Sequence, residues 1–166
     1  MRRLGIFACV GVLGIALVGC NHSSSGNASA ASATADAPAK PAATADQFAW
    51  GDYLAAQGKL HGKDVGMRPY IYVIPAGDSV AATARRKEET DSVVHSIGPI
   101  LMPGGMLIVG GPDAKQTTDF INDLATQLKA DAMQRIVVMV VSNPSEQAAV
   151  TSALKPSGAT IRFVTM

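Results

Sequence analysis

The sequence predicts an α/β fold, with a small, mostly parallel sheet, helices packed on the sheet and the element order β-α-β-α-β-α-β. Short apolar, β-branched runs alternate with longer amphipathic segments from residue 68 to residue 166. The continuous apolar run at residues 136–141 is typical of a strand buried on both faces of a parallel sheet. A stretch of about 100 residues is long enough to bury one hydrophobic core.

The composition agrees with a folded domain and excludes one class of partner. The 166 residues are 48% hydrophobic and 16% charged, which is the opposite of the balance in a disordered chain. The formal net charge is +1, and Arg2 and Arg3 supply two of the positive charges. Because the rest of the chain has no basic surplus, nucleic acid is not an expected partner.

The first residues have the pattern of an export signal. Arg2 and Arg3 precede an uncharged apolar stretch, residues 4–18. This stretch is short for a membrane-spanning helix, which needs about 20 apolar residues, and is typical of a signal peptide. It ends in Leu17-Val18-Gly19-Cys20, which resembles the lipobox of bacterial lipoprotein precursors. The resemblance implies a lipoprotein signal peptide over residues 1–19 and a diacylglycerol on the Cys20 thiol, whose acyl chains include palmitate.

The same resemblance implies a location. A lipid on Cys20 would hold the protein on a bacterial membrane, with its domain facing the periplasm. Residue 21 is Asn rather than Asp, which in lipoproteins of enteric-type bacteria favours the outer membrane over the inner one. Cys9 lies in the apolar stretch and would leave with the signal peptide, so neither a disulfide nor a reactive thiol is expected in the mature domain.

Two segments separate the signal from the α/β domain. Residues 20–45 are predicted to be the lipidated cysteine and a disordered tether, because Ala, Ser, Thr and Pro dominate. Residues 46–67 are predicted to form a short helix and a loop. The helix is expected to end at Gly58, and residues 59–68 are predicted to be a loop or a short edge strand. The expected apolar residues of this helix are Phe48, Trp50, Tyr53 and Leu54.

The α/β domain itself is expected over residues 68–166. Its strands are predicted at residues 70–74, 106–109, 136–141 and 161–164. Val138, in the middle of the all-apolar run, is expected to lie in a central strand.

Three helices are predicted between these strands. The first begins at Asp78 or Ser79, runs to about His95 and carries spaced apolar residues, namely Val80, Ala84, Val94, Ile97 and Leu101. The second follows Asp113 and presents an apolar face of Phe120, Ile121, Leu124, Ala125 and Leu128. The third ends at Leu154 and is expected to begin at a cap, Asn143 or Ser145.

The loops after the first three strands are the candidate ligand site, because ligands of open α/β sheets bind outside the carboxyl ends of the strands. These loops are residues 75–79, 110–113 and 142–145. Their candidate ligand residues are Asp78, Ser79, Gly110, Gly111, Asp113, Ser142 and Asn143. Helix capping and tight turns explain the same residues without any ligand.

Each loop also contains a short motif. Gly77-Asp78-Ser79 resembles the nucleophile block of GDSL-type hydrolases, which implies attack by Ser79, but the family's late histidine is absent because no histidine follows His95. The segment 110–113 could bind phosphate, but it lacks both phosphate-loop patterns and Asp113 would repel an anion. The segment 140–144 is similar to the strand-end Ser-Asn-Pro of lactate and malate dehydrogenases, whose glycine-rich first turn is missing here.

These observations favour a non-catalytic function. We expect a lipid-anchored interaction or assembly protein of the bacterial cell envelope, such as an accessory of a secretion, conjugation or pilus machine. Its expected partners are the membrane, through Cys20, and an envelope protein, with the oligomeric state left open. The alternative is a small hydrolase or small-ligand-binding domain that uses the three loops. No cofactor is expected, and no metal is expected because the three histidines, one of which lies in the tether, form no cluster.

Overall fold

A computed structural model describes residues 37–166. The predicted signal peptide, Cys20 and most of the predicted tether lie outside the described residues. The elements, in chain order, are α1 (Gln47–His61), β1 (Tyr70–Val73), α2 (Val80–Ser96), β2 (Met106–Gly110), α3 (Ala114–Gln127), β3 (Val137–Ser142), a 3-10 turn (Pro144–Glu146), α4 (Gln147–Leu154), a second 3-10 turn (Lys155–Ser157) and β4 (Thr160–Thr165).

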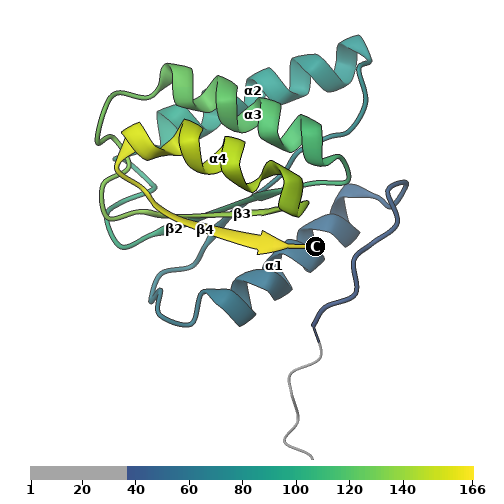
Figure 1. Cartoon of the computed structure of the whole chain (residues 1–166), viewed down its shortest axis with the longest axis horizontal. Helices are drawn as coiled ribbons and strands as arrows, with labels where there is room; N and C mark the ends of the chain where they lie inside the picture. The colour runs from purple at the N-terminus through teal and green to yellow at the C-terminus, as the bar shows by residue number, and fades with distance from the viewer. Residues whose placement is uncertain (1–36) are drawn as a thin grey trace, which may run out of the picture. The chain divides into compact units, whose positions relative to one another are not determined.

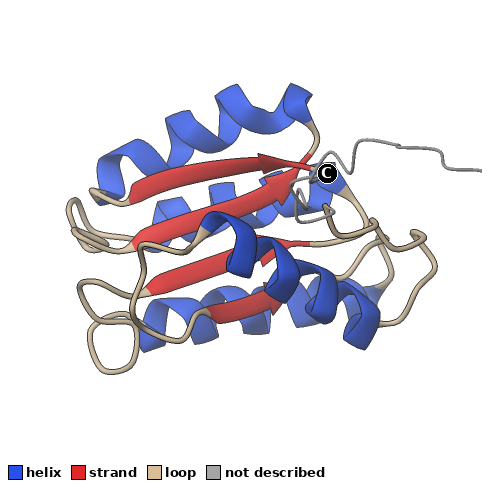
Figure 2. Cartoon of the chain, turned by 90° about the horizontal axis from the view of Figure 1, so that it is seen from below, coloured by secondary structure: helices blue, strands red, loops and turns tan. Residues whose placement is uncertain are grey.

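In residues 37–166 the strands form one four-stranded parallel sheet in the order β1-β2-β3-β4 (Figure 2). The register places Leu107 of β2 beside Val138 of β3, and Val138 beside Ile161 of β4. Val138 is fully buried, and β3 has a neighbouring strand on each side. The predicted α/β fold and the central position of Val138 are therefore confirmed.

The strand order decides how the helices are distributed. Each crossover moves one strand further in the same direction, and crossovers of one hand then place their helices on the same face of the sheet. Figure 1 shows α2, α3 and α4 together on one face and α1 alone on the other. The domain therefore has three layers, and the layer opposite the crossover helices is α1.

The larger hydrophobic core lies between the sheet and the crossover helices. Alternate residues of β2 and β3, including Leu107 and Val140, point into it. Phe120, Ile121 and Leu124 of α3 are buried there, as the predicted apolar face of that helix requires. This cluster anchors all three crossover helices to one sheet face.

The second core lies between the sheet and α1. Trp50, Tyr53 and Leu54 pack against the strand residues that point away from the larger core. These residues are Met106, Ile108, Met139, Val141 and Val164. The rings of Trp50 and Tyr53 meet edge to face, with centroids 5.7 Å apart. A parallel sheet must be covered on both faces, and α1 supplies the second cover. Both cores are built from residues 45–166.

Helix α1 differs from its predicted form. It begins after Asp46, whose carboxylate accepts a hydrogen bond from the Ala49 amide at 2.8 Å, but it continues to His61 instead of ending at Gly58. Gly58 lies inside the helix because the helix approaches β2 closely there. A Cβ on Gly58 would lie 2.5 Å from Cδ1 of Ile108. Phe48, expected on the apolar face, is 85% exposed.

Helix α2 begins at the predicted cap. The Ser79 hydroxyl accepts a hydrogen bond from the Ala82 amide at 3.1 Å. Val80, the first of the spaced apolar residues expected in this helix, is 89% exposed. The first turns of α2 are exposed, and its buried contacts come later in the helix, at Thr90 and Val93.

Candidate functional site

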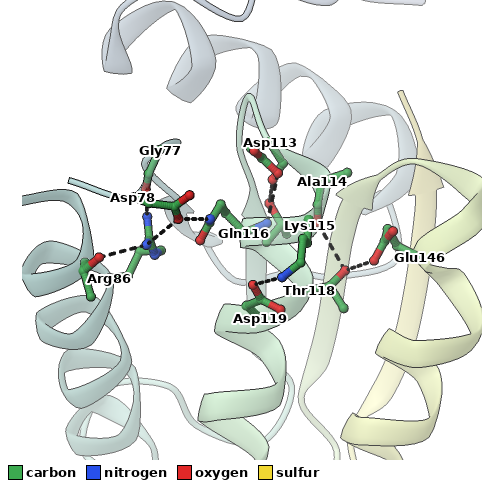
Figure 3. A network of polar contacts seen from close by, with 12 residues as sticks. Gly77, Asp78, Arg86, Asp113, Ala114, Lys115, Gln116, Thr118, Asp119 and Glu146 are labelled. Atoms are coloured by element: carbon green, nitrogen blue, oxygen red, sulfur yellow. Dashed lines mark hydrogen bonds and ion pairs between the residues drawn. The ribbon is translucent and has the colours of Figure 1, made fainter. Parts of the chain in front are cut away.

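The loops after β1, β2 and β3 lie together at the carboxyl ends of the strands, because the strands are parallel. Figure 3 shows a network of polar side chains that links these loops and the helices that follow them. Its members come from the start of α2, the first turns of α3 and the 3-10 turn after β3. The candidate residues of the three loops therefore do lie along one edge, as the sequence predicts.

Arg86 of α2 holds the first loop in place. Its Nη1 donates to the carbonyl oxygens of Pro75 at 3.1 Å and Gly77 at 2.7 Å, and its Nη2 donates to Oγ1 of Thr83 at 3.2 Å. Gly77 has a φ of +85°, a conformation that favours glycine. The guanidinium is thus bound to the backbone of the loop and is 13% exposed.

Asp78 and Ser79 are both engaged in local structure. Oδ1 of Asp78 accepts a hydrogen bond from Nε2 of Gln116 at 2.7 Å, which joins the first loop to α3 (Figure 3). Ser79 caps α2, and His95 lies at the other end of that helix, about 24 Å away at 1.5 Å per residue. Nδ1 of His95 lies 2.6 Å from the carbonyl oxygen of Asp91. The arrangement therefore does not give Ser79 a base from His95.

The second loop uses its glycines for packing. A Cβ on Gly110 would lie 2.7 Å from Cδ2 of Leu54 and 2.9 Å from the carbonyl oxygen of Val141, and a Cβ on Gly111 would collide with the carbonyl oxygen of Ile74. Oδ1 of Asp113 accepts a hydrogen bond from the Gln116 amide at 3.0 Å. The amide that an anion would need at the start of α3 is thus already bound by a carboxylate.

The third loop contains a buried hydroxyl and a cap position without a side-chain hydrogen bond. Ser142 is fully buried, and its Oγ has no hydrogen-bond partner among the described residues. Asn143 occupies the N-cap position of the 3-10 turn, as predicted, but its side chain makes no capping hydrogen bond. Glu146 joins this loop to α3, because its carboxylate accepts a hydrogen bond from Oγ1 of Thr118 at 2.6 Å.

A groove of about 580 Å³ runs between α2 and α3 beside this network. Its charged side chains include Lys115, whose Nζ donates to Oδ2 of Asp119 at 2.6 Å. That hydrogen bond, with the negative charge of Asp119, raises the pKa of Lys115, so the amine stays protonated and is not a nucleophile. Residues 37–166 contain no group of three side chains of the metal-ligating types.

A larger hollow, of about 940 Å³, lies at the opposite end of the sheet. It is bounded by the second half of α1, by residues 62–70 and by the start of β1 and β2. The sequence predicted a loop or short edge strand over residues 59–68 and did not indicate this site. The available signal was the set of apolar residues at Val65, Met67 and Pro69 placed among basic residues.

An ion pair holds one wall of this hollow. Nη1 and Nη2 of Arg162 on β4 donate to the two carboxylate oxygens of Asp64 at 2.9 and 3.0 Å, and Nη1 also donates to the carbonyl oxygen of His61. The guanidinium holds the pKa of the Asp64 carboxyl below its usual value, mainly through these hydrogen bonds. The segment after α1 is therefore tied to the far strand of the sheet.

The fold and its two ends define a small three-layer parallel α/β domain whose carboxyl-end loops are linked to one another. In comparisons with known proteins, no family model matches the chain, and no curated protein or solved structure matches it. No helix in the described part of the chain is long and apolar enough to cross a membrane.

Proposed function

We propose that this chain is a lipid-anchored periplasmic protein of the bacterial cell envelope that acts by contact with another envelope protein. The partner would belong to an assembly such as a secretion, conjugation or pilus machine. The lipobox resemblance at Cys20 supports the anchor. The unpaired side of strand β4 is the observation that supports contact with another protein.

Among residues 37–166, strand β4 lies at one end of the sheet and has a strand beside it on one side only. The amides of Thr160 and Met166 donate to β3-side carbonyl oxygens, those of Ile136 and Ser142, at 2.9 and 3.3 Å. Successive residues of a strand point their amides to opposite sides, so those of Ile161, Phe163 and Thr165 point away from β3. These groups can accept a strand from a partner.

The sequence of β4 leaves this edge open. Proteins commonly protect an edge strand with proline, with lysine or with an inward-pointing charge. The six residues of β4 contain neither proline nor lysine, and their one charged residue, Arg162, is bound to Asp64. Main-chain pairing along β4 would bind a partner without any catalytic group.

The alternative is a small hydrolase or small-ligand-binding domain at loops 75–79, 110–113 and 142–145. The buried, unpartnered hydroxyl of Ser142 is the observation that favours it. The engagement of Asp78, Ser79 and Asp113 in caps and links supports contact instead. An ester hydrolysis activity that disappears in Ser79→Ala, with the fold intact, would establish the alternative.

The test is photo-cross-linking of the full chain in the cells that produce it. A photoreactive amino acid at Thr160, exposed on β4, should give a discrete protein adduct, whereas the same group at Thr151, exposed on α4, should not. Thr165→Pro removes an outward amide that β3 does not use and should abolish the adduct, and Thr165→Val should preserve it. An adduct of equal strength from both positions, or one that survives Thr165→Pro, would contradict the proposal.

The anchor has a separate test. Radiolabelled palmitate should enter the full chain and should not enter Cys20→Ser, because no other thiol lies at the lipobox. Equal labelling of the two proteins would show that Cys20 is not the site of the lipid.

A further inference from the structure

The hollow at the amino end of the sheet has an apolar floor. The floor is formed by Ala55 of α1, by Ile71 and Met106 at the start of β1 and β2, and by Val65, Met67 and Pro69 of the intervening segment. Its volume of about 940 Å³ falls in the range of about 300–1,000 Å³ that is common for small-molecule sites. Met106 is 1% exposed, and the other floor residues are partly exposed and offer an apolar surface that water covers in the free protein.

The rim of the hollow is basic. Lys59, Lys63 and Arg68 line it, and all three are exposed. Within residues 37–166 none of the three forms an ion pair. The only acidic residue of segment 59–68 is Asp64, and its carboxylate is bound to Arg162. The three cations are therefore available to an anion that enters the hollow.

Gly62, which follows α1, and the ion pair between Asp64 and Arg162 hold this shape. Gly62 lies so close to β2 that a Cβ there would be 2.9 Å from Cε of Met106 and 2.6 Å from the carbonyl oxygen of Gly58. Arg162 binds both Asp64 and the carbonyl oxygen of His61, which fixes the segment after α1. The hollow is thus built from packed and hydrogen-bonded parts of the fold.

We propose that this hollow binds a single-chain amphiphile with an anionic head, such as a fatty acid, with the chain on the floor and the head among the three cations. Charge complementarity selects the occupant, because an unopposed basic rim beside an apolar floor matches a molecule that is anionic at one end and apolar along the rest. Binding of this amphiphile requires neither a lipid on Cys20 nor a partner on β4, so its failure would leave the proposed function unaffected.

The test uses the full chain, with the methionine methyl groups labelled for NMR. Octanoate should shift saturably the signals of Met67 and Met106, which line the hollow, and leave unchanged those of Met133 and Met139, which do not line it. Decanoate should bind about tenfold more tightly, because two further methylene groups are buried. Octan-1-ol should bind more weakly than octanoate, and acetate should cause no saturable shift.

Variants separate the head from the chain. Lys59→Gln, Lys63→Gln and Arg68→Gln together should weaken octanoate binding about tenfold, as expected for three exposed charge contacts, and leave octan-1-ol binding unchanged. The matched control changes Lys87, Lys129 and Lys155, which are exposed elsewhere, to Gln and should leave both affinities unchanged.

Three results would overturn the proposal. The first is the absence of saturable shifts at Met67 and Met106, with the fold intact. The second is equal affinity for octanoate and octan-1-ol, which would mean that the cations do not recognise the head. The third is equal affinity for octanoate, decanoate and acetate, which would indicate an anion site without a role for the floor.

Discussion

The hydroxyl of Ser142 lies fully buried at the end of β3, without a hydrogen-bond partner among the described residues. Burying an unpaired hydroxyl costs about 1–3 kcal/mol. Ser142→Ala should therefore raise the free energy of unfolding by about 1 kcal/mol, measured by urea denaturation. Ser157 is the control, because its buried Oγ donates to the Leu154 carbonyl oxygen at 2.7 Å. Ser157→Ala should lower the stability, and a loss of stability in Ser142→Ala as well would show that its hydroxyl has a partner.

Asp64 predicts a dependence of stability on pH. Its pKa is lowered in the folded protein by Arg162, so the ionised carboxylate stabilises the fold above the unfolded-state pKa. This contribution is lost as the pH falls through the lower, folded-state pKa. Asp64→Asn should thus be less stable than the native chain at neutral pH, and the difference should shrink below about pH 4. A difference that is constant from neutral to acid pH in urea denaturation would contradict the ion pair.

At the scale of the elements, strand β3 is the most sensitive to a buried charge. Val138 lies in the middle of β3, between two strands and against the core formed with α2, α3 and α4. Val138→Asp would bury an unpaired carboxylate, which costs several kcal/mol against a typical total stability of about 5–15 kcal/mol. We expect loss of the cooperative thermal transition, measured by circular dichroism. Normal unfolding of this variant would contradict the buried position of β3.

The elements that the sequence predicts well are those with strong local signals. The β-branched runs and the cap at Ser79 gave the strands and the start of α2, because these signals act within a few residues. The course of α1 past Gly58 was missed, since glycine usually ends a helix and here permits close packing on Ile108. Its position on the second face of the sheet depends on tertiary contacts that no local pattern contains.

The candidate site was also predicted only where its signals are local. Asp113 and Ser79 were recognised as potential caps from sequence alone. The hydrogen bond between Gln116 and Asp78 joins residues 38 positions apart, so only the folded chain reveals it. The basic, apolar hollow was missed for the same reason, because its floor combines α1, a loop and the first residues of two strands.

At the scale of the whole molecule, residues 37–166 should fold without the preceding segment. Both cores are contained in residues 45–166, and no cysteine lies after residue 20, so no disulfide is required. Limited proteolysis of the full chain should cut before residue 42 and spare residues 46–166. The boundary follows from the turn at residues 42–45, where the Ala42 carbonyl oxygen accepts a hydrogen bond from the Trp50 indole at 3.2 Å. First cleavage within residues 70–141 would contradict this organisation.

The solitary position of α1 gives the domain a mechanical weak point. A pulling force applied through the residues before Ala37 reaches α1 before it reaches any strand, because α1 is the first element of the described chain. The three crossover helices are each connected to the sheet at both ends, whereas α1 is joined to a strand only through its carboxyl end. Tension would therefore detach α1 from the sheet, beginning at Trp50 and proceeding toward Gly62. The hydrogen bond from Arg162 to the His61 carbonyl oxygen would oppose the last step. One face of the sheet would be exposed while the core on the opposite face stayed intact.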